Sequence, residues 1–449
     1  MRAYRSVSSR VARLFGRARL AKGKIITMNG KFWQRQIELA GLSDIAQKVE
    51  NGERLSFDDG LRLYATPHLN IVGFLANIVR ERKNGNLAYW VRNQHVNYTN
   101  VCNKGCLFCS FYARPKDDPR AYVMTPQQAA QKVRNYADVP ISEVHVVGGV
   151  NPKLPYAYYL ELLQEIKAAR PAAHIKAFTM VEIDQIVRAA KKSPREVFED
   201  LKAAGLDALP GGGAEVMSDR VHEDLFATKP DAARWLELAR EAHLCGLKSN
   251  ATLLYGHIEQ TPEKVEHFLK LRELQDETGG FLTFIPLSWH PEKTALEDLK
   301  APTGVEDLRE IAVSRLMLDN FPHIKSFWIM NSAPVTQSAL WFGADDVDGT
   351  IMEYEIIRDP SRDRKQVLTS RALVEMIIEA GREPLERDPL YNILSRGLEG
   401  VSDVETLLSN RNADLIQPDA NVNILNSGIE TASQKLKEKG RELIALEAR

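Results

Sequence analysis

The stretch Asn97-Tyr-Thr-Asn-Val-Cys102-Asn-Lys-Gly-Cys106-Leu-Phe-Cys109 decides how the rest of the chain is interpreted. Its first residues belong to a predicted β-strand, His95–Thr99, so the cysteines come at the end of that strand. Thiolates are the ligands that iron–sulfur clusters require, and a loop with these spacings can wrap one cubane. Three local ligands leave one iron open, and open coordination is typical of catalytic metal sites.

An open iron can accept the amino nitrogen and carboxylate of S-adenosylmethionine (SAM). An electron passed into the sulfonium then releases a 5′-deoxyadenosyl radical. We therefore interpret Cys102, Cys106 and Cys109 as ligands of a 4Fe–4S cluster in a radical SAM enzyme. Gly105 eases the turn between them, and Phe108 is expected to shield the cluster.

Two alternatives to this interpretation are a zinc site completed by His95 or His145, and three unrelated thiols. The position of the loop at the mouth of a strand disfavours both. Clustered cysteines in a long chain indicate metal binding in a reducing compartment, so we expect a cytoplasmic protein. The fourth cysteine, Cys245, ends an apolar helix and is predicted to be a buried core thiol.

The composition is that of a globular protein with a normal core, with 44% hydrophobic and 27% charged residues among 449. Residues 1–37 contain ten Lys or Arg and no acidic residue, so the remainder is acidic although the net charge is −1. An acidic remainder predicts no nucleic-acid partner. No apolar run reaches about 18 residues, so no membrane span is expected either.

Short apolar strands and amphipathic helices alternate from residue 95 onward, which predicts right-handed βαβ units and a parallel sheet. We expect an α/β fold, a (β/α)8 TIM-like radical SAM barrel over residues 93–395, with catalytic loops at the carboxyl ends of the strands. A helical extension (32–92) should precede it, after a basic and disordered leader (1–31) that includes a second possible start, Met28. A tail (396–449) follows. The last two barrel strands are predicted at Lys325–Met330 and Leu340–Gly343.

Glycines and small polar residues follow several of the predicted strands. Glycines let the backbone approach a ligand closely. The alternative is that these glycines only form structural turns and bind no ligand. Ribose hydroxyls and adenine need polar and apolar partners, respectively. The expected SAM-binding residues at these strand ends are Gly148, Gly149, Thr179, Gly212, Asn250, Thr252 and Leu254.

Three titratable residues near strand ends are candidates for catalysis: His257, His290 and Glu182. A neutral imidazole near pH 7 suits a general base. Each histidine is equally well explained as a hydrogen-bonded structural residue. Glu182 has the alternative of a solvated or helix-capping carboxylate.

Longer motifs carry a resemblance to one family. They include Leu55-Ser-Phe-Asp-Asp-Gly60, Glu143-Val-His-Val-Val-Gly-Gly149, Leu209-Pro-Gly-Gly-Gly-Ala-Glu215, Tyr255-Gly-His-Ile-Glu259 and Gly381-Arg-Glu-Pro-Leu-Glu-Arg-Asp388. Over about residues 42–393 the chain resembles aminofutalosine synthase, a radical SAM transferase of the futalosine route to menaquinone. The basic leader and the tail after about Gly397 depart from the family pattern.

The resemblance implies that the adenosyl radical adds to the double bond of a chorismate-derived enol ether, 3-(1-carboxyvinyloxy)benzoate. The adduct rearranges and loses its carboxylate, giving aminodeoxyfutalosine, methionine and bicarbonate. A one-electron reductant such as flavodoxin or ferredoxin is implied as partner. Two rival functions remain: hydrogen abstraction by a sibling, either dehypoxanthine futalosine cyclase or a deazaflavin-forming synthase, and a non-catalytic iron–sulfur protein.

Overall fold

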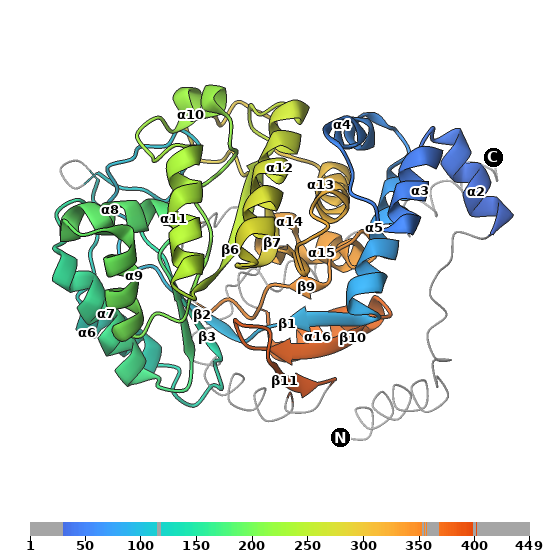
Figure 1. Ribbon diagram of the computed structural model, residues 1–449. Coiled ribbons are helices and arrows are strands. Elements are labelled where there is room, and N and C mark those ends of the chain that lie inside the picture. Colours follow the sequence, from blue (N-terminus) through green and yellow to red (C-terminus); the bar gives the residue numbers. More distant parts are fainter. Residues whose placement is uncertain are drawn as a thin grey trace, which may run out of the picture. The chain divides into compact units, whose positions relative to one another are not determined.

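The computed structural model describes residues 30–114, 118–352, 354, 356, 368–397 and 401. Almost all of the predicted leader and tail therefore lies outside the described residues. Within them, strands alternate with helices that pack around a curled sheet (Figure 1). None of the helices in these ranges is both long and apolar enough to cross a membrane.

The strands join into one 11-stranded sheet in the order β11-β10-β1-β9-β8-β7-β6-β5-β4-β3-β2. Neighbouring strands are parallel, except that β10 and β11 are antiparallel. The strands are β1 (Leu87–Trp90), β2 (Asn93–Val96), β3 (Glu143–Val146), β4 (His174–Ala177), β5 (Ala208–Leu209), β6 (Lys248–Tyr255), β7 (Phe281–Ser288), β8 (His323–Ser326), β9 (Asp346–Val347), β10 (Glu383–Arg387) and β11 (Ile393–Arg396).

The residues after β9 close the curl between β9 and β2. The backbone N–H of His95 donates to the carbonyl of Met352 at 2.8 Å, and the N–H of Met352 donates to the carbonyl of Asn93 at 3.2 Å. Strands β2 to β9 thus form a closed ring, while β1, β10 and β11 extend the sheet beyond it. The predicted α/β barrel is confirmed.

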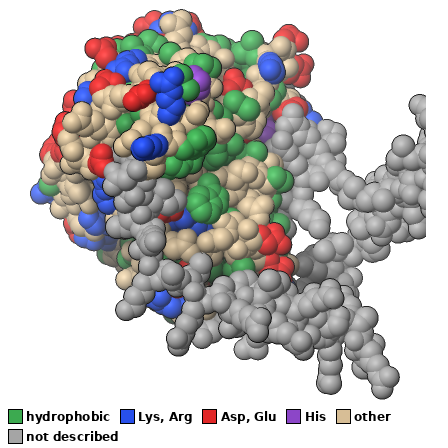
Figure 2. All heavy atoms as spheres, turned by 90° about the vertical axis from the view of Figure 1, so that its right-hand side faces the viewer, with side chains coloured by type: hydrophobic (Ala, Val, Ile, Leu, Met, Phe, Trp, Pro, Cys, Tyr) green, Lys and Arg blue, Asp and Glu red, His purple; other side chains and the backbone are tan. Residues whose placement is uncertain are grey.

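Local sequence signals fix most of the helix boundaries. Ser56, Thr125, Thr179, Ser193 and Thr303 each form a capping box with the third residue of the helix that follows. The helices are α2 (Lys31–Leu39), α3 (Ser43–Asn51), α4 (Phe57–Ala65), α5 (Leu69–Asn84), α6 (Pro126–Arg134), α7 (Tyr156–Ala169), α8 (Met180–Ala190), α9 (Pro194–Ala203), α10 (Asp219–Leu225), α11 (Ala232–Leu244), α12 (Thr261–Thr278), α13 (Gly304–Met317), α14 (Trp328–Asn331), α15 (Ala333–Ala339) and α16 (Ser370–Glu379). Figure 2 looks onto the side that carries α2–α5, where hydrophobic side chains are interspersed with charged ones.

Two strand predictions near the end of the ring differ from the structure. The predicted strand Leu340–Gly343 is wrong, because these apolar residues form the turn after α15 and the last ring strand is β9. The predicted strand Lys325–Met330 ends early, since Trp328–Asn331 turns into α14. In the predicted helical extension, the last residues form β1, which pairs with β10.

Paired charges fill the inside of the ring below the strand ends. Lys176 donates to Glu143 at 3.0 Å, and both side chains are at most 2% exposed. Lys325 lies 3.6 Å from Asp348, and Arg387 binds Asp346 at 2.6 Å. Because each buried charge has a partner, this interior is polar and yet compatible with folding.

Candidate active site

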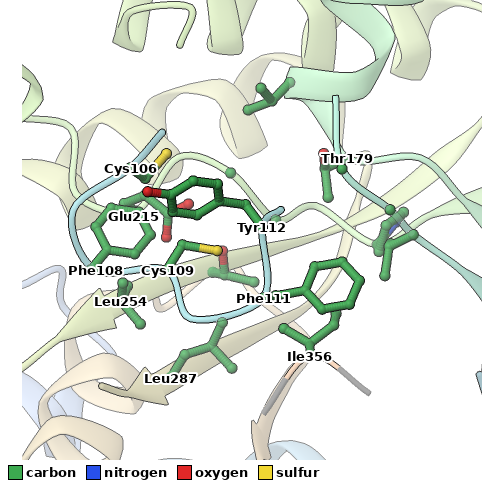
Figure 3. A pocket seen from close by; sticks show the side chains of 18 of the residues that line it. Cys106, Phe108, Cys109, Phe111, Tyr112, Thr179, Glu215, Leu254, Leu287 and Ile356 are labelled. Atoms are coloured by element: carbon green, nitrogen blue, oxygen red, sulfur yellow. The ribbon is translucent and has the colours of Figure 1, made fainter. Parts of the chain in front are cut away.

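A cavity of about 330 Å³ lies where the strands end at their carboxyl side. Loops after β2, β3, β4, β5, β7, β8 and β9 contribute to its wall, as expected for an α/β barrel. Figure 3 shows Cys106, Cys109 and Tyr112 of the cysteine loop together with Thr179 and Leu254 around this space. Of the predicted site residues, those that line the cavity are Cys102, Cys106, Cys109, Gly148, Gly149, Thr179, Gly212, Thr252, Leu254 and His290.

The cysteine loop is held from two sides by backbone hydrogen bonds. The N–H of Asn103 donates to the carbonyl of Val150 at 3.0 Å, and the N–H of Leu107 donates to the carbonyl of Leu225 at 3.1 Å. Gly105 has a φ of 59°, a conformation that a side chain disfavours, so the predicted role of this glycine in the turn is supported.

The three thiols of the cysteine loop share one space. Cys102, Cys106 and Cys109 all line the cavity. Burial raises the pKa of the Cys106 thiol to about 12 and also raises the pKa of Cys109. Such thiols ionise only when iron binds, because metal coordination deprotonates a thiol. The donor set therefore fits an iron–sulfur cubane.

Lys229 is a cavity residue that the sequence analysis did not identify. Its ammonium pairs with Glu215 and lies 5.1 Å from the ring centre of Phe108. Burial alone would lower the pKa of Lys229, but Cys106 and Glu215 outweigh burial and keep its pKa above the usual value. The site thus places a largely buried cation beside the cysteine sulfurs, where it would balance the negative charge of a thiolate-bound cluster.

Glu182 does not line the cavity but supports two loops that do. Its carboxylate accepts hydrogen bonds from Tyr98 Oη at 2.8 Å, the Gly148 N–H at 3.0 Å, and both the N–H and the hydroxyl of Thr179 at 2.8 Å. Burial raises the pKa of Glu182 to about 7 despite these four donors. The helix-capping alternative therefore describes Glu182, which fixes Gly148 and Thr179 relative to each other.

The glycine loops pack closely against neighbouring backbone. A Cβ at Gly149 would lie 2.4 Å from the carbonyl oxygen of Val101, and one at Gly211 would lie 1.7 Å from that of Asn250. Asn250 itself is buried and does not line the cavity, and its Oδ1 has no hydrogen-bond partner among the described residues. These glycines hold the loop after β3 against the cysteine loop, and the loop after β5 against β6.

The two histidine candidates occupy different positions. His257 does not line the cavity, and both of its ring nitrogens bond to its own turn, to the Leu254 carbonyl at 3.1 Å and the Ile258 N–H at 2.8 Å. The structural alternative therefore fits His257, which stacks near Phe108 of the cysteine loop. His290 does line the cavity, and its Nε2 lies 3.1 Å from the Met330 carbonyl.

Comparison with known proteins places this geometry in a family. Residues 96–272 match the model of the Radical SAM superfamily, and residues 278–398 match the CofH/MqnC C-terminal region. Among solved structures, methylornithine synthase has a TM-score of 0.60 at 17% identity and covers 76% of this chain and 97% of its own, which supports the fold alone.

Curated relatives are similar over most of the chain. Aminodeoxyfutalosine synthase of Thermus thermophilus is 44% identical over 78% of this chain and 95% of its own length. The enzyme of the same name from Streptomyces coelicolor is 41% identical over 80% of this chain and 96% of its own length. Cyclic dehypoxanthine futalosine synthase of Streptomyces coelicolor is 32% identical over 80% of this chain and 90% of its own length. The chain therefore belongs to the radical SAM superfamily, and within it to the aminodeoxyfutalosine synthase family.

Proposed function

We propose that the protein is a transferase that joins the 5′-deoxyadenosyl group of SAM to 3-(1-carboxyvinyloxy)benzoate. With one water, the products are aminodeoxyfutalosine, methionine, bicarbonate and a proton. The observation that carries the proposal is the 44% identity to an aminodeoxyfutalosine synthase over 95% of that enzyme's length. The cavity supports it, because three cysteines and the loops expected to hold SAM line one space.

Cys102, Cys106 and Cys109 would hold the 4Fe–4S cluster through three of its irons. When bound, the cluster supplies the electron that cleaves SAM. Gly148, Gly149 and Thr179 lie on one side of the cavity, while Gly212, Thr252 and Leu254 come from the neighbouring loop and strand. We assign these six residues to SAM, since they surround the space beside the cysteine loop. Asn250 is buried and does not line the cavity, so its predicted contact with SAM stays a prediction.

The protein's own part in the reaction is to orient the reactants and to exclude water. Apolar side chains of Ile285, Leu287, Phe327 and Met330 line the cavity. Walls of this kind protect a carbon radical from water and from stray hydrogen donors. A radical held beside a double bond then forms a carbon–carbon bond in preference to abstracting hydrogen.

We further propose that a flavodoxin or ferredoxin supplies the electron. A second hollow, of about 390 Å³, shares Cys106 and Cys109 with the cavity and is also lined by Arg114, Arg120 and Lys293, and by Asp118, which pairs with Arg120. An acidic electron-transfer protein suits a basic surface next to the cluster ligands. A cytoplasmic location is consistent with such a donor.

Sibling functions that proceed by hydrogen abstraction are supported more weakly. The futalosine cyclase relative is 32% identical, and a 4-hydroxyphenyl transferase of Methanoculleus marisnigri is 36% identical. No observation in the described residues supports the function of a non-catalytic iron–sulfur protein.

The test is anaerobic incubation of the reconstituted protein with dithionite, SAM and the enol ether, followed by mass spectrometry. The proposal expects a decarboxylated adduct that contains the adenosyl group, together with an equal amount of methionine. The Cys109→Ala variant, treated in the same way, should form neither. Methionine formation without any adduct would reject the synthase and favour a sibling.

A further inference from the structure

His95 is a buried side chain on β2 whose polar atoms are unused. It lines the cavity and is 3% exposed, yet neither Nδ1 nor Nε2 has a hydrogen-bond partner among the described residues. A buried donor or acceptor left without a partner destabilises the folded protein. Native proteins leave few such groups, and those that remain call for a function. An imidazole with both nitrogens unused and a cavity beside it is arranged to bind a ligand.

Aromatic rings pack around the imidazole of His95. The parallel pairing of β2 with β3 sets His95 beside His145, and the two rings stack with centres 4.6 Å apart. The ring of Tyr354 meets His95 edge-on at 5.3 Å, and Phe327 lies 5.8 Å from Tyr354. All four residues line the cavity. Stacked and edge-on aromatic rings favour a planar aromatic ligand.

This cluster borders the residues assigned to SAM on one side only. Thr179, Gly212, Thr252 and Leu254 come from β6 or from the loops after β4 and β5, whereas His95 is on β2 and Phe327 follows β8. The two sets meet at β3, which carries His145 and is followed by Gly148 and Gly149. The bridge between Met352 and Gln94 of β2 brings the segment after β9 next to His95. The part of the cavity between β8 and β3 is therefore available to a second reactant.

The charge of His95 and its neighbours decides which group the imidazole would bind. Burial lowers the pKa of His95 to about 3, so the ring is neutral at pH 7 and carries one N–H. Asp348, which also lines the cavity, is occupied by the Asn93 amide at 3.1 Å, by the Gly349 N–H at 2.8 Å and by Lys325 at 3.6 Å. The N–H of His95 is thus available to an anionic group in this part of the cavity, and bonds to charged acceptors are the stronger ones.

We propose that His95, His145, Tyr354 and Phe327 form the subsite for the aromatic substrate, and that the His95 N–H donates a hydrogen bond to one of its carboxylates. This inference rests on the proposed function, because it takes the enol-ether benzoate as the second reactant. It assigns His95 a role in substrate binding and leaves SAM cleavage to the other part of the cavity.

The test measures the dissociation constant of 3-(1-carboxyvinyloxy)benzoate for the oxidised, SAM-loaded holoenzyme by calorimetry, which needs no turnover. His95→Phe keeps an aromatic ring and removes the N–H. We expect it to weaken binding by about 10- to 100-fold, since a hydrogen bond to a charged group contributes roughly 1.5–3 kcal/mol and 1.4 kcal/mol is a factor of ten. His95→Gln, which retains an N–H, should bind more tightly than His95→Phe. The dissociation constant of SAM should not change.

A matched control is His174→Phe, because His174 lies on β4 outside the cavity. It should bind the enol ether like the wild type. If His95→Phe and His95→Gln both bind within about twofold of the wild type, a difference below about 0.5 kcal/mol, the subsite is refuted. An equal loss of SAM binding in both variants would also refute it, since it would indicate a general packing defect. Failure of the wild type to form any adduct would instead reject the proposed function, so the two failures are distinguishable.

Discussion

Replacing Glu182 by Gln should disturb the protein far more than an isosteric change usually does. Each carboxylate oxygen accepts from one backbone N–H and one hydroxyl: Oε1 from Gly148 and Tyr98, and Oε2 from the N–H and hydroxyl of Thr179. In glutamine, one of these oxygens becomes an NH2 group. The hydroxyls can turn, but a backbone N–H of Gly148 or Thr179 must then face another donor.

The magnitude follows from that single mismatch. A buried donor that loses its acceptor costs about 1–3 kcal/mol, so we expect the free energy of unfolding to fall by about 2 kcal/mol. The measurement is urea unfolding followed by circular dichroism at pH 8, above the pKa of about 7 of Glu182, so that the carboxylate is ionised. The KM for SAM should rise as well, because Gly148 and Thr179 line the cavity.

Glu196→Gln is a matched control for this change. Glu196 forms the same capping box with Ser193 at the start of α9, but it is exposed to solvent. Glutamine caps a helix nearly as well as glutamate there, so the loss should stay below about 0.5 kcal/mol. Equal stability of the two variants would refute the reasoning that Glu182 is a buried acceptor of four donors.

Other changes test the remaining features of the site and the core. Alanine at any one of the three loop cysteines should abolish the brown absorbance and SAM cleavage, whereas Cys245→Ala should keep both; iron retained without a loop cysteine would contradict the ligand assignment. Lys229→Met leaves Glu215 as an unpaired buried carboxylate, so the free energy of unfolding should fall by about 3–5 kcal/mol. Adding Glu215→Gln should recover part of this loss. If the double variant recovers no stability, the Lys229–Glu215 pair does not contribute as argued. Burial lowers the pKa of His267 to about 3, so the unfolded chain binds the proton more readily and stability should fall as pH drops from about 6.5 toward 3. His267→Gln should flatten that fall in acid-unfolding curves, and an unchanged slope would show that His267 does not contribute.

Features encoded in short stretches could be predicted from the sequence. The cysteine spacing and the alternation of strands and helices depend on residues close together in the chain. The strand β9 could not be found in this way. It is short and begins with Asp346, a buried aspartate held by Arg387 from a distant strand, so it lacks the apolar pattern by which strands are recognised.

The same reason explains which site residues were missed. Lys229 was not identified, and His95 was considered only as a zinc ligand, because their neighbours are remote in sequence: Glu215 and Phe108 for the lysine, and Tyr354 for the histidine. Conversely, Glu182 was predicted near the site because Thr179 and Glu182 follow a strand. That spacing is also the signature of a capping box, and only the fold distinguishes a cap below the cavity from a group inside it.

The central claim is that the adenosyl radical adds to the substrate and does not abstract hydrogen from it. The direct measurement uses SAM labelled in the ribose and adenine, the enol ether and dithionite, with labelled products separated by chromatography. Addition predicts that most of the label appears in a decarboxylated adduct and that free 5′-deoxyadenosine is a minor by-product. Label found only in 5′-deoxyadenosine, in proportion to turnover, would contradict the account.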